Sequence, residues 1–225
     1  MPEARSFYEA ASGYHATQLA VSERAFERMA RERARKLQPL IPATARVIEY
    51  GVGTGLNLAA VECGVRVGYD VADHLRAEVE RRGIEFASDM AALGGGSFDV
   101  ALSHHSLEHT PEPGAALDEI RRTLVPGGRL LLFVPYEKEG RYREFRRDEP
   151  NHHLYSWNPQ TLANLVETRG FVVESAGCAP TGYERFAGEW IARLGLGDRA
   201  FRTALALLRA IRLPEEVRLI ARNSV

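Results

Sequence analysis

Residues 47–55 read Val-Ile-Glu-Tyr-Gly-Val-Gly-Thr-Gly, an apolar run that ends in an acid and enters glycines at every second position. The apolar run predicts a buried β-strand. Glycine is needed where the backbone turns tightly off a strand and where a ligand approaches too closely for any Cβ atom. Gly51, Gly53 and Gly55 therefore predict a loop that holds a nucleotide-containing cofactor.

The spacing of these glycines argues against a dinucleotide cofactor. A dinucleotide-binding loop carries G-x-G-x-x-G, or alanine at the final position, so that helix and strand pack closely. Counted from Gly51, the third small position falls on Leu56, which is too large for this packing. Hydride-transfer chemistry on NAD is therefore disfavoured.

The same run, Glu49-x-Gly51-x-Gly53-x-Gly55, resembles motif I of the class I S-adenosylmethionine (SAM)-dependent methyltransferases. The resemblance implies that Glu49 acts on the methionine ammonium of SAM, directly or through water, and that the three glycines line the cofactor. A purely structural turn between strand and helix remains the alternative for a glycine loop taken alone.

A second acid follows at the distance that a βαβ unit requires. Asp70 ends a short apolar strand at 65–70 and lies 19 residues after Gly51, the separation at which a carboxylate meets a ribose. Its alternative role, the N-cap of the next helix, suits Asp73 better, and we expect that helix to end at Gly83. Asp70 is therefore the predicted ribose ligand.

A third strand is expected at 84–87, and Asp89 just beyond it matches the family's acid that accepts from the adenine amino group. A solvated loop aspartate is its alternative. In the N-terminal segment, Tyr8 or Tyr14 is expected to close over the sulfonium, because aromatic faces attract cations by on the order of 1 kcal/mol; stapling the N-terminal helix to the core is the other reading. The remaining expected cofactor contacts are Val71, Met90 and Ser103.

The longest resemblance to small-molecule methyltransferases covers residues 97–135. It comprises Ser-Phe-Asp-Val-Ala-Leu-Ser-His-His-Ser-Leu-Glu-His-Thr-Pro-Glu-Pro and, from residue 117, Leu-Asp-Glu-Ile-Arg-Arg-Thr-Leu-Val-Pro-Gly-Gly-Arg-Leu-Leu-Leu-Phe-Val-Pro. It matches the family pattern FDVV…LEH…L.E..R.LKPGG.L…P. We expect a buried strand at 98–103, a helix over about 114–124, a Pro-Gly-Gly turn at 126–128 and a further buried strand.

The remaining sequence supplies the last elements of this fold. Asn158 and Pro159 predict the start of a helix that stops at Gly170, and strands are expected at 171–176 and 217–222. The resemblance implies an α/β, Rossmann-like, doubly wound, mostly parallel seven-stranded sheet. Its strand order is 3-2-1-4-5-7-6, with the last strand antiparallel and helical lid insertions.

We expect one methyltransferase domain over 1–225, with three segments outside the sheet plan. These are an N-terminal helical lid at 1–40 and substrate-side insertions at 136–157 and 177–216. Open α/β sheets bind ligands at the carboxyl edge, near the reversal of strand order between strands 1 and 4, so the extra segments should form the substrate pocket. The apolar surface of 177–216 leaves four roles open: core packing, a roof for an apolar substrate, subunit pairing as a homodimer, or contact with a membrane surface.

Composition limits the other classes of protein. The net charge of −1 and the pI near 6.7 give no basic field for nonspecific nucleic-acid binding. Cys63 and Cys178 lack metal or redox spacing. The chain starts without a cationic apolar signal and lacks a run of roughly 18 apolar residues. A cytoplasmic enzyme without a membrane span is expected.

Five of the seven histidines cluster on the loops expected after strands 4 and 5: His104, His105, His109, His152 and His153. Methyl transfer to a hydroxyl or thiol requires loss of a proton, and histidine suits a base near neutral pH. We rank His105 first as the catalytic base, with His104 and His153 as rivals. Alternatively, His109 packs structurally in the Leu-Glu-His turn, and His152 and His153 only shape the pocket.

A metal site is the competing interpretation of the same residues. His105, Glu108 and His109 have the i, i+3, i+4 spacing that places three ligands on one helical face, with His152 or His153 completing the site. The spacing resembles the E-x-x-E-H pattern of metal-using methyltransferases of RNA 3′ ends and of quinone precursors, except that His105 replaces the first glutamate. Because the Leu-Glu-His turn also occurs in family members without a metal, we assign none.

These features together predict a SAM-dependent methyltransferase acting on a small molecule, with O-methylation slightly preferred over N-, C- or S-methylation. A methyltransferase of RNA or protein is a rival. Against it stand the near-neutral charge and Ser103-His104-His105-Ser106 in place of an N-P-P-Y-type motif after strand 4. The other rival is a non-catalytic SAM-binding protein, against which the intact glycines and both acids argue.

Overall fold

The computed structural model describes residues 21–137, 144, 145, 147, 151–211 and 215–224. The strands of that part are β1 (Arg46–Tyr50), β2 (Val65–Tyr69), β3 (Glu85–Ala87), β4 (Phe98–His104), β5 (Leu124–Tyr136), β6 (Phe171–Pro180) and β7 (Glu215–Asn223). The helices are α3 (Glu23–Leu37), α4 (Arg76–Arg81), α5 (Pro113–Thr123), α6 (Pro159–Thr168), α7 (Glu184–Arg193) and α8 (Asp198–Ile211), with 3-10 turns η2 (Gln38–Leu40), η3 (Asp73–Leu75) and η4 (Leu107–His109).

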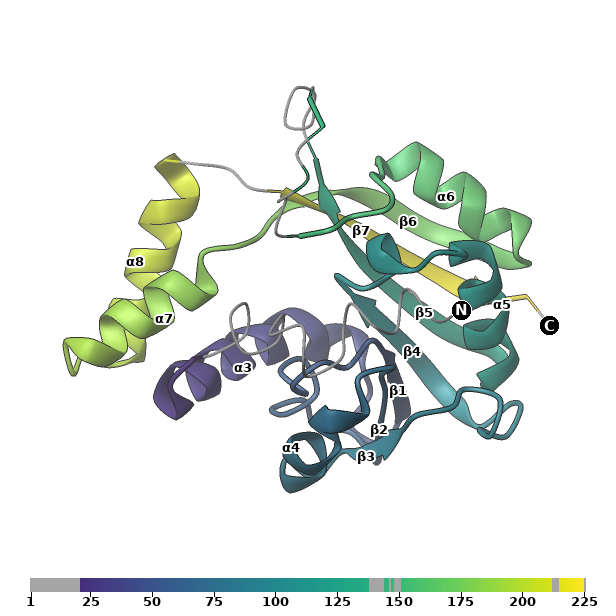
Figure 1. Cartoon of the computed structure of the whole chain (residues 1–225), viewed down its shortest axis with the longest axis horizontal. Helices are drawn as coiled ribbons and strands as arrows, with labels where there is room; N and C mark the ends of the chain where they lie inside the picture. Colours follow the sequence, from purple (N-terminus) through teal and green to yellow (C-terminus); the bar gives the residue numbers. More distant parts are fainter. Residues whose placement is uncertain (1–20, 138–143, 146, 148–150, 212–214, 225) are drawn as a thin grey trace.

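The strands form one seven-stranded sheet in the order β3-β2-β1-β4-β5-β7-β6 (Figure 1). β1 pairs in parallel with β2 and β4, whereas β7 is antiparallel to both β5 and β6. The predicted fold class and strand order are confirmed. The order reverses between β1 and β4, so the carboxyl ends of these two strands form the switch point where such sheets bind ligands.

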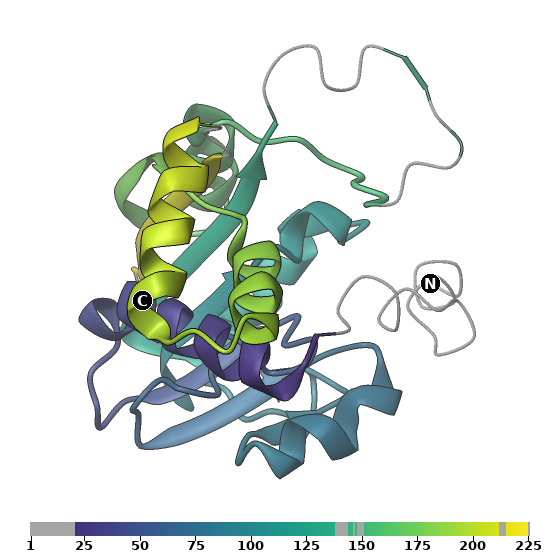
Figure 2. The ribbon, with the colours of Figure 1, turned by 90° about the vertical axis from the view of Figure 1, so that its left-hand side faces the viewer.

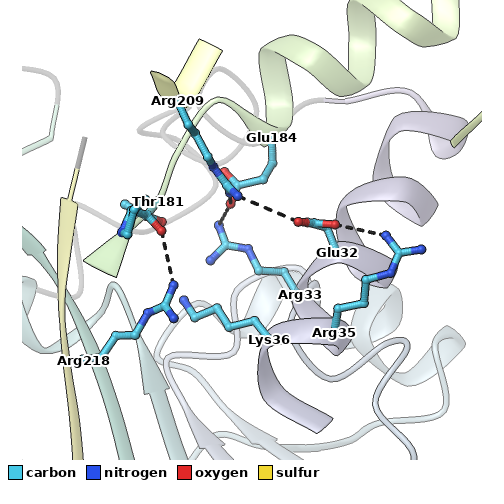
Figure 3. Close-up of a pocket in the computed structure, with 9 residues that line it drawn as sticks. Glu32, Arg33, Arg35, Lys36, Thr181, Glu184, Arg209 and Arg218 are labelled. Carbon is cyan, nitrogen blue, oxygen red and sulfur yellow. Dashed lines mark hydrogen bonds and ion pairs between the residues drawn. The ribbon is translucent and has the colours of Figure 1, made fainter. Parts of the chain in front are cut away.

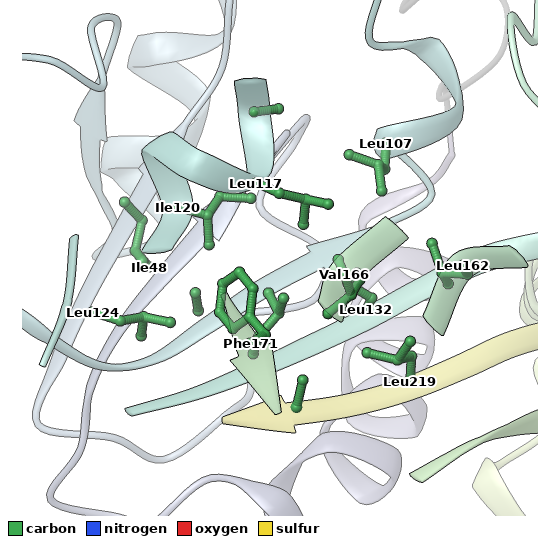
Figure 4. Packing of buried hydrophobic residues seen from close by; sticks show 14 of the residues in the cluster. Ile48, Leu107, Leu117, Ile120, Leu124, Leu132, Leu162, Val166, Phe171 and Leu219 are labelled. Atoms are coloured by element: carbon green, nitrogen blue, oxygen red, sulfur yellow. The ribbon is translucent and has the colours of Figure 1, made fainter. Parts of the chain in front are cut away.

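The sheet is covered on both faces, and the side chains of β5 point alternately into the two core clusters. Leu130, Leu132 and Val134 pack in the core cluster beneath α5 and α6, whereas Leu131 and Phe133 pack in the cluster beneath α3 and α4. Successive strand residues point to opposite faces, so an unbroken apolar run is what a strand buried on both sides requires. Figure 4 shows the first cluster, in which side chains from α5, α6 and the strands interdigitate.

Two helices begin with side-chain caps. Ser22 caps α3 by accepting a hydrogen bond from the amide of Ala25, and this helix lies within the helical segment expected at 1–40. Asn158 caps α6, its side chain accepting from the Thr161 amide at 2.9 Å, and Pro159 takes the first helical position. α6 ends before Gly170, which has a φ of +78°.

The structure differs from the expectations around β1 and β2 in two places. After the glycine loop, residues 53–60 form turns rather than a regular crossover helix. Asp73 is the first residue of η3 and not an N-cap, and its carboxylate pairs with Arg76 at 2.8 Å. The carboxylate of Asp70, directly after β2, accepts from the Ala72 amide at 2.9 Å. The expected helix stop is confirmed, since α4 ends at Arg81 and Gly83 follows with a φ of +73°.

The predicted Pro-Gly-Gly turn at 126–128 lies inside β5 as an irregularity of the strand. Phe98 pairs with Leu124 and Val100 pairs with Arg129, so the intervening residues of β5 bulge out of register. Gly127 has a φ of +72°, which explains why a glycine stands there. The turn is therefore a bulge, and the strand begins earlier than the sequence predicted.

The insertion between β6 and β7 forms α7 and α8, which pack on each other and, through α7, on α3 (Figures 1 and 2). Four residues of this pair form a buried cluster: Ala187, Ile191, Phe201 and Leu205. Core packing therefore accounts for part of its apolar surface, while Phe186, Trp190, Leu194, Leu207 and Ile211 are exposed. Across the described residues, every helix is too short or too polar to cross a membrane. Tyr8 and Tyr14 lie outside the described residues.

Candidate active site

The three glycines of the loop have backbone angles that favour glycine, and one of them borders open space. Gly51, Gly53 and Gly55 all have positive φ angles, of 77°, 51° and 81°, a region that side chains strain. A Cβ atom on Gly51 would lie 2.3 Å from the Cβ of Ser106, and one on Gly55 would lie 2.8 Å from Ile84. At Gly53 a Cβ atom would have no described atom within 4 Å. The outer glycines are therefore required by the protein's own packing, whereas Gly53 faces space that a ligand can fill.

Glu49 lies beneath this loop with no exposed surface. The amide of Asn57 donates to its Oε1 atom at 2.5 Å, and its Oε2 atom is buried without a hydrogen-bond partner in the described part of the chain. Burial raises the pKa of Glu49 to about 8, although the Asn57 hydrogen bond and Arg33 lower it. A buried carboxylate oxygen without a donor is costly. The site therefore fits a ligand that brings a donor or a positive charge, as an ammonium does.

Asp70 bridges the glycine loop to the turn after β2. Its Oδ2 atom accepts from the Gly53 amide at 2.8 Å and its Oδ1 atom accepts from the Ala72 amide at 2.9 Å. A carboxylate offers about four lone-pair sites, so acceptor capacity remains for a hydroxyl pair. The ribose role predicted for Asp70 is compatible with its place next to Gly53.

The other predicted cofactor residues differ in how accessible they are. Asp89 is exposed and accepts from the Ala91 amide at 2.9 Å, and Val71 is 38% exposed. Met90 is buried in the core, and Ser103 is fully buried with its hydroxyl 3.0 Å from that of Ser106. Met90 and Ser103 are buried as whole residues, so a ligand would contact them only after a local rearrangement. Their roles, like that of Tyr14, stay predictions.

His105 follows β4 in a strained backbone conformation. Its φ is +53°, one of three positive values among the described residues other than glycine, and such strain costs roughly 1–3 kcal/mol and clusters at functional sites. Its ring stacks on His104 with 4.4 Å between centroids, and its Nε2 atom lies 3.4 Å from Glu216 Oε2. Burial lowers the pKa of His105 despite the opposing effect of Glu216. The imidazole is therefore neutral near pH 7, as a base requires.

His104 is the less suitable of the two neighbours. It is 7% exposed, and its Nε2 atom contacts Arg33 Nη1 and lies 2.9 Å from Lys36 Nζ. Burial, reinforced by Arg33 and Lys36, lowers the pKa of His104 far below its ordinary value. Because Nε2 of His104 already faces two donors, its environment favours a positioning role over that of a base. The side chain of His105 is 33% exposed and is therefore more accessible to an acceptor.

Glu216 is a site residue that the sequence did not indicate. Its side chain has no exposed surface and lies 2.5 Å from Lys36 Nζ and 2.8 Å from Arg218 Nε. Burial raises the pKa of Glu216, but His105 and Lys36 lower it more, so the carboxylate is ionised. The signal was available: β7 is antiparallel, so its first residues meet the carboxyl ends of the parallel strands. We expected this strand to begin at 217, and it begins at Glu215.

A second cluster gathers around η4. Ligand atoms of Glu108, His109 and His153 lie within 4.8 Å of one another, and His153 Nδ1 is 2.7 Å from Glu137 Oε1. Both carboxylate oxygens of Glu108 are buried without a hydrogen bond to a described residue, and burial raises the pKa of this group to about 8. A buried carboxylate beside two imidazoles is chemically suited to a divalent metal.

This second cluster corrects the metal hypothesis in one respect. The hypothesis placed His105 with Glu108 and His109 on one helical face. In the structure the left-handed backbone of His105 directs its ring to Glu216, and η4 begins only at Leu107. His153 takes the third place near Glu108 instead.

A family model described as a methyltransferase domain matches residues 21–176, more than half of the chain. This chain belongs to that methyltransferase family. With the confirmed sheet order, it is a class I methyltransferase, the class that uses SAM. Its membership explains why the glycine loop, the two acids and the Leu-Glu-His block occur in this order.

Two curated proteins illustrate the similarity. Ubiquinone biosynthesis O-methyltransferase of Xanthomonas oryzae pv. oryzae (strain PXO99A) is 34% identical over 102 residues, which cover 40% of this chain and 43% of that protein. Thiol S-methyltransferase TMT1B of Homo sapiens is 30% identical over 127 residues, which cover 50% and 52%. The matched region of this methyltransferase thus spans about half the length of each relative.

A solved structure supports the fold over nearly the whole chain. The 1,6-didemethyltoxoflavin-N1-methyltransferase of Burkholderia thailandensis, with bound 1,6-didemethyltoxoflavin and S-adenosylhomocysteine, superposes with a TM-score of 0.64. The alignment covers 98% of this chain and 87% of that one at 22% identity. At that identity the likeness shows a shared fold.

Proposed function

We propose that this methyltransferase transfers the methyl group of SAM to a small-molecule acceptor, with oxygen slightly preferred as the accepting atom. The observation that carries the proposal is that three features gather at the carboxyl edge of β1, β4 and the start of β7: the open space at Gly53, the unpaired oxygen of Glu49 and the His105–Glu216 pair. The proposal assigns the first two to the cofactor and the third to the base, at the switch point of the sheet.

SAM would supply a methyl group on a positively charged sulfur, which leaves as a neutral thioether. In the proposed complex Glu49 balances the ammonium, Asp70 accepts from the ribose hydroxyls and Asp89 accepts from the adenine amino group. Glu49 then regains the charge that burial suppresses in the free protein, because an ammonium beside it favours the ionised form.

His105 is the proposed base. Because its Nε2 atom faces Glu216, we assign the proton of the neutral ring to Nε2, which leaves Nδ1 free to accept. In the proposed complex Nδ1 would accept the O–H proton of the acceptor, Glu216 would stabilise the resulting imidazolium, and bound SAM would supply the methyl group to the acceptor oxygen. The rest of the rate enhancement comes from proximity and exclusion of water.

The preference for oxygen and for a small acceptor draws on the similarity to an O-methyltransferase of ubiquinone biosynthesis. The similarity to a thiol S-methyltransferase makes sulfur the next candidate. RNA or protein as acceptor and a non-catalytic role are the rival proposals. We propose a small-molecule acceptor, no nucleic-acid partner and a cytoplasmic location, with a homodimer as one candidate assembly.

The direct experiment is an acceptor screen that measures S-adenosylhomocysteine release with phenols, thiols, amines and RNA in parallel. The proposal predicts release with a phenol or another hydroxyl compound. Release only with RNA or a protein would replace it with the first rival. SAM binding without release for any acceptor would favour the non-catalytic one.

We propose turnover without a metal, so a chelator is expected to leave the rate unchanged. If turnover does require a metal, the Glu108–His109–His153 cluster is one candidate site for it. If chelation abolishes activity and a divalent metal restores it, His153→Ala should lower the metal affinity of the enzyme. His105 belongs, with His104 and Glu216, to the other described group whose ligand atoms lie within 4.8 Å of one another. A loss of metal affinity in His105→Ala but not in His153→Ala would therefore place the metal there instead.

A further inference from the structure

A pocket of about 250 Å³ lies between α3, the α7–α8 insertion and the start of β7 (Figure 3). Its lining is dominated by cations from three different elements. The charged lining residues are Arg33, Arg35 and Lys36 of α3, Arg209 of α8, Arg218 of β7, and the two acids Glu32 and Glu184.

The acids near this pocket do not neutralise its cations. Glu184 is shared between Arg209 at 2.9 Å and Arg33 at 3.7 Å. Glu216, just beneath the pocket, is likewise shared between Lys36 and Arg218. The third acid contacts Arg35 and Arg209. Among the described residues, four arginines and Lys36 therefore share three carboxylates. The arginines alone exceed the acids by one positive charge, and protonation of Lys36 adds a second.

Some of this positive charge is buried and incompletely paired. The side chain of Arg33 is 11% exposed, and its Nε atom lacks a hydrogen-bond partner in the part of the chain that the structure describes. Lys36 is 15% exposed, and burial, together with Arg33, lowers its pKa to about 7 against the effect of Glu216. Buried charges are costly unless they are paired, so an anion would relieve both groups.

The size and the donor geometry specify the kind of anion. Pockets for whole drug-sized ligands measure roughly 300–1,000 Å³, so this smaller pocket suits one charged group and its nearest atoms. Guanidinium groups bind carboxylates and phosphates through paired N–H donors. We propose that the pocket binds an oxyanion, a carboxylate or phosphate group carried by the methyl acceptor.

The link to the acceptor rests on the proposed function, and Lys36 provides it. The ammonium of Lys36 lines the pocket and also lies 2.9 Å from His104 Nε2. His104 in turn stacks on His105, the proposed base. Two side-chain contacts, through Lys36 and His104, therefore join the oxyanion site to the base. We propose an acceptor that passes alongside these side chains, with its acid group in the pocket and its hydroxyl at His105.

Anion binding can be tested without any methyl transfer. Lys36 and Lys138 are the only lysines of the chain, so Lys138→Arg leaves a single lysine whose ¹⁵N and ¹³C signals report on the pocket. Titration with inorganic phosphate and with benzoate at constant ionic strength should shift the Lys36 signals saturably and raise the pKa of Lys36, while chloride should not. The tighter of the two probes identifies the oxyanion.

Three variants of this single-lysine chain make the test specific. Arg33→Gln and, separately, Arg218→Gln should weaken the binding of the tighter probe at least tenfold. Arg46→Gln, which removes an exposed arginine paired with Asp99, is the matched control and should change it less than twofold. An equal response to chloride, a response that does not saturate, or equal binding in all three variants would overturn the proposal.

The role in acceptor recognition has its own test. Among paired acceptors such as 4-hydroxybenzoate and 4-hydroxybenzamide, Arg209→Gln, which changes a lining residue away from the proposed base and cofactor residues, should lower kcat/KM at least tenfold for the acid and less than twofold for the amide. Equal losses for both would exclude the pocket as the acceptor's anchor. If neither compound is methylated while phosphate or benzoate still binds, the proposed function fails for these acceptors and the oxyanion site stands.

Discussion

Glu216 Oε2 lies 3.4 Å from His105 Nε2. This contact joins the first residues of the antiparallel strand β7 to the residue that follows the parallel strand β4. The two residues are brought together only by the insertion of β7 beside β5. The carboxylate is buried and ionised, and the imidazole is neutral. In the proposed mechanism Glu216 supports the ring orientation and the charged form of His105.

His105→Ala should lower turnover by roughly 10²–10⁴, because general-base assistance contributes on that order. The affinity for SAM should stay within a few fold, since the base acts on the acceptor. Steady-state kinetics and calorimetry measure the two quantities. With a phenolic acceptor the loss should shrink at high pH, where the phenol ionises without help. A loss that is independent of pH, or full turnover at neutral pH, would remove His105 as the base.

Glu216→Gln should shift the pH dependence of kcat/KM as well as its size. Glu216 raises the pKa of His105 against the dominant effect of burial, so its neutralisation lowers that pKa further. The acid limb of the profile should therefore move to lower pH, while the plateau falls because the ring is a weaker base. An acid limb that stays in place would show that Glu216 has only a structural role.

The glycine loop predicts opposite outcomes for two of its members. Gly53→Val should abolish SAM binding, because its side chain fills the open space. The φ of +51° adds backbone strain of roughly 1–3 kcal/mol, which lowers the melting temperature but leaves the circular dichroism spectrum largely native. Gly51→Ala should instead destabilise the fold, because the new Cβ atom would meet Ser106 at 2.3 Å. Thermal denaturation and SAM titration of both variants separate these effects. Retained SAM binding in Gly53→Val would refute the assignment of the loop.

Glu49 should make the free protein less stable as the pH rises. Burial raises its folded-state pKa from 4.5 to about 8, so the stabilising contribution of the protonated form is complete below about pH 4.5 and is lost as the pH rises to about 8. Glu49→Gln keeps the uncharged shape and should flatten this part of the pH dependence. Urea denaturation of both proteins at pH 5, 6.5 and 8 measures it. Parallel curves would contradict the raised pKa.

The sequence predicted well the sheet and the meeting of the glycine loop with Asp70, because both depend on local signals. Strand-length apolar runs, glycines at a strand end and an acid 19 residues later are visible without tertiary information. The prediction that the ring of His105 lies beside Glu108 was wrong, because the left-handed backbone of His105 turns its side chain toward Glu216. The spacing of residues in a sequence does not reveal such a φ angle. The roles of Glu216 and Lys36 were missed because they depend on β7 and α3 meeting β4 across long sequence separations.

The central claim is that the glycine loop, together with Asp70, binds SAM. Calorimetric titration with S-adenosylhomocysteine and with NAD tests this claim most directly. The account predicts saturable binding of S-adenosylhomocysteine, none of NAD, and a tenfold to hundredfold weaker affinity in Asp70→Ala, since losing the ribose contact costs roughly 1–3 kcal/mol. Binding of NAD, or an unchanged dissociation constant for S-adenosylhomocysteine in Asp70→Ala, would contradict it.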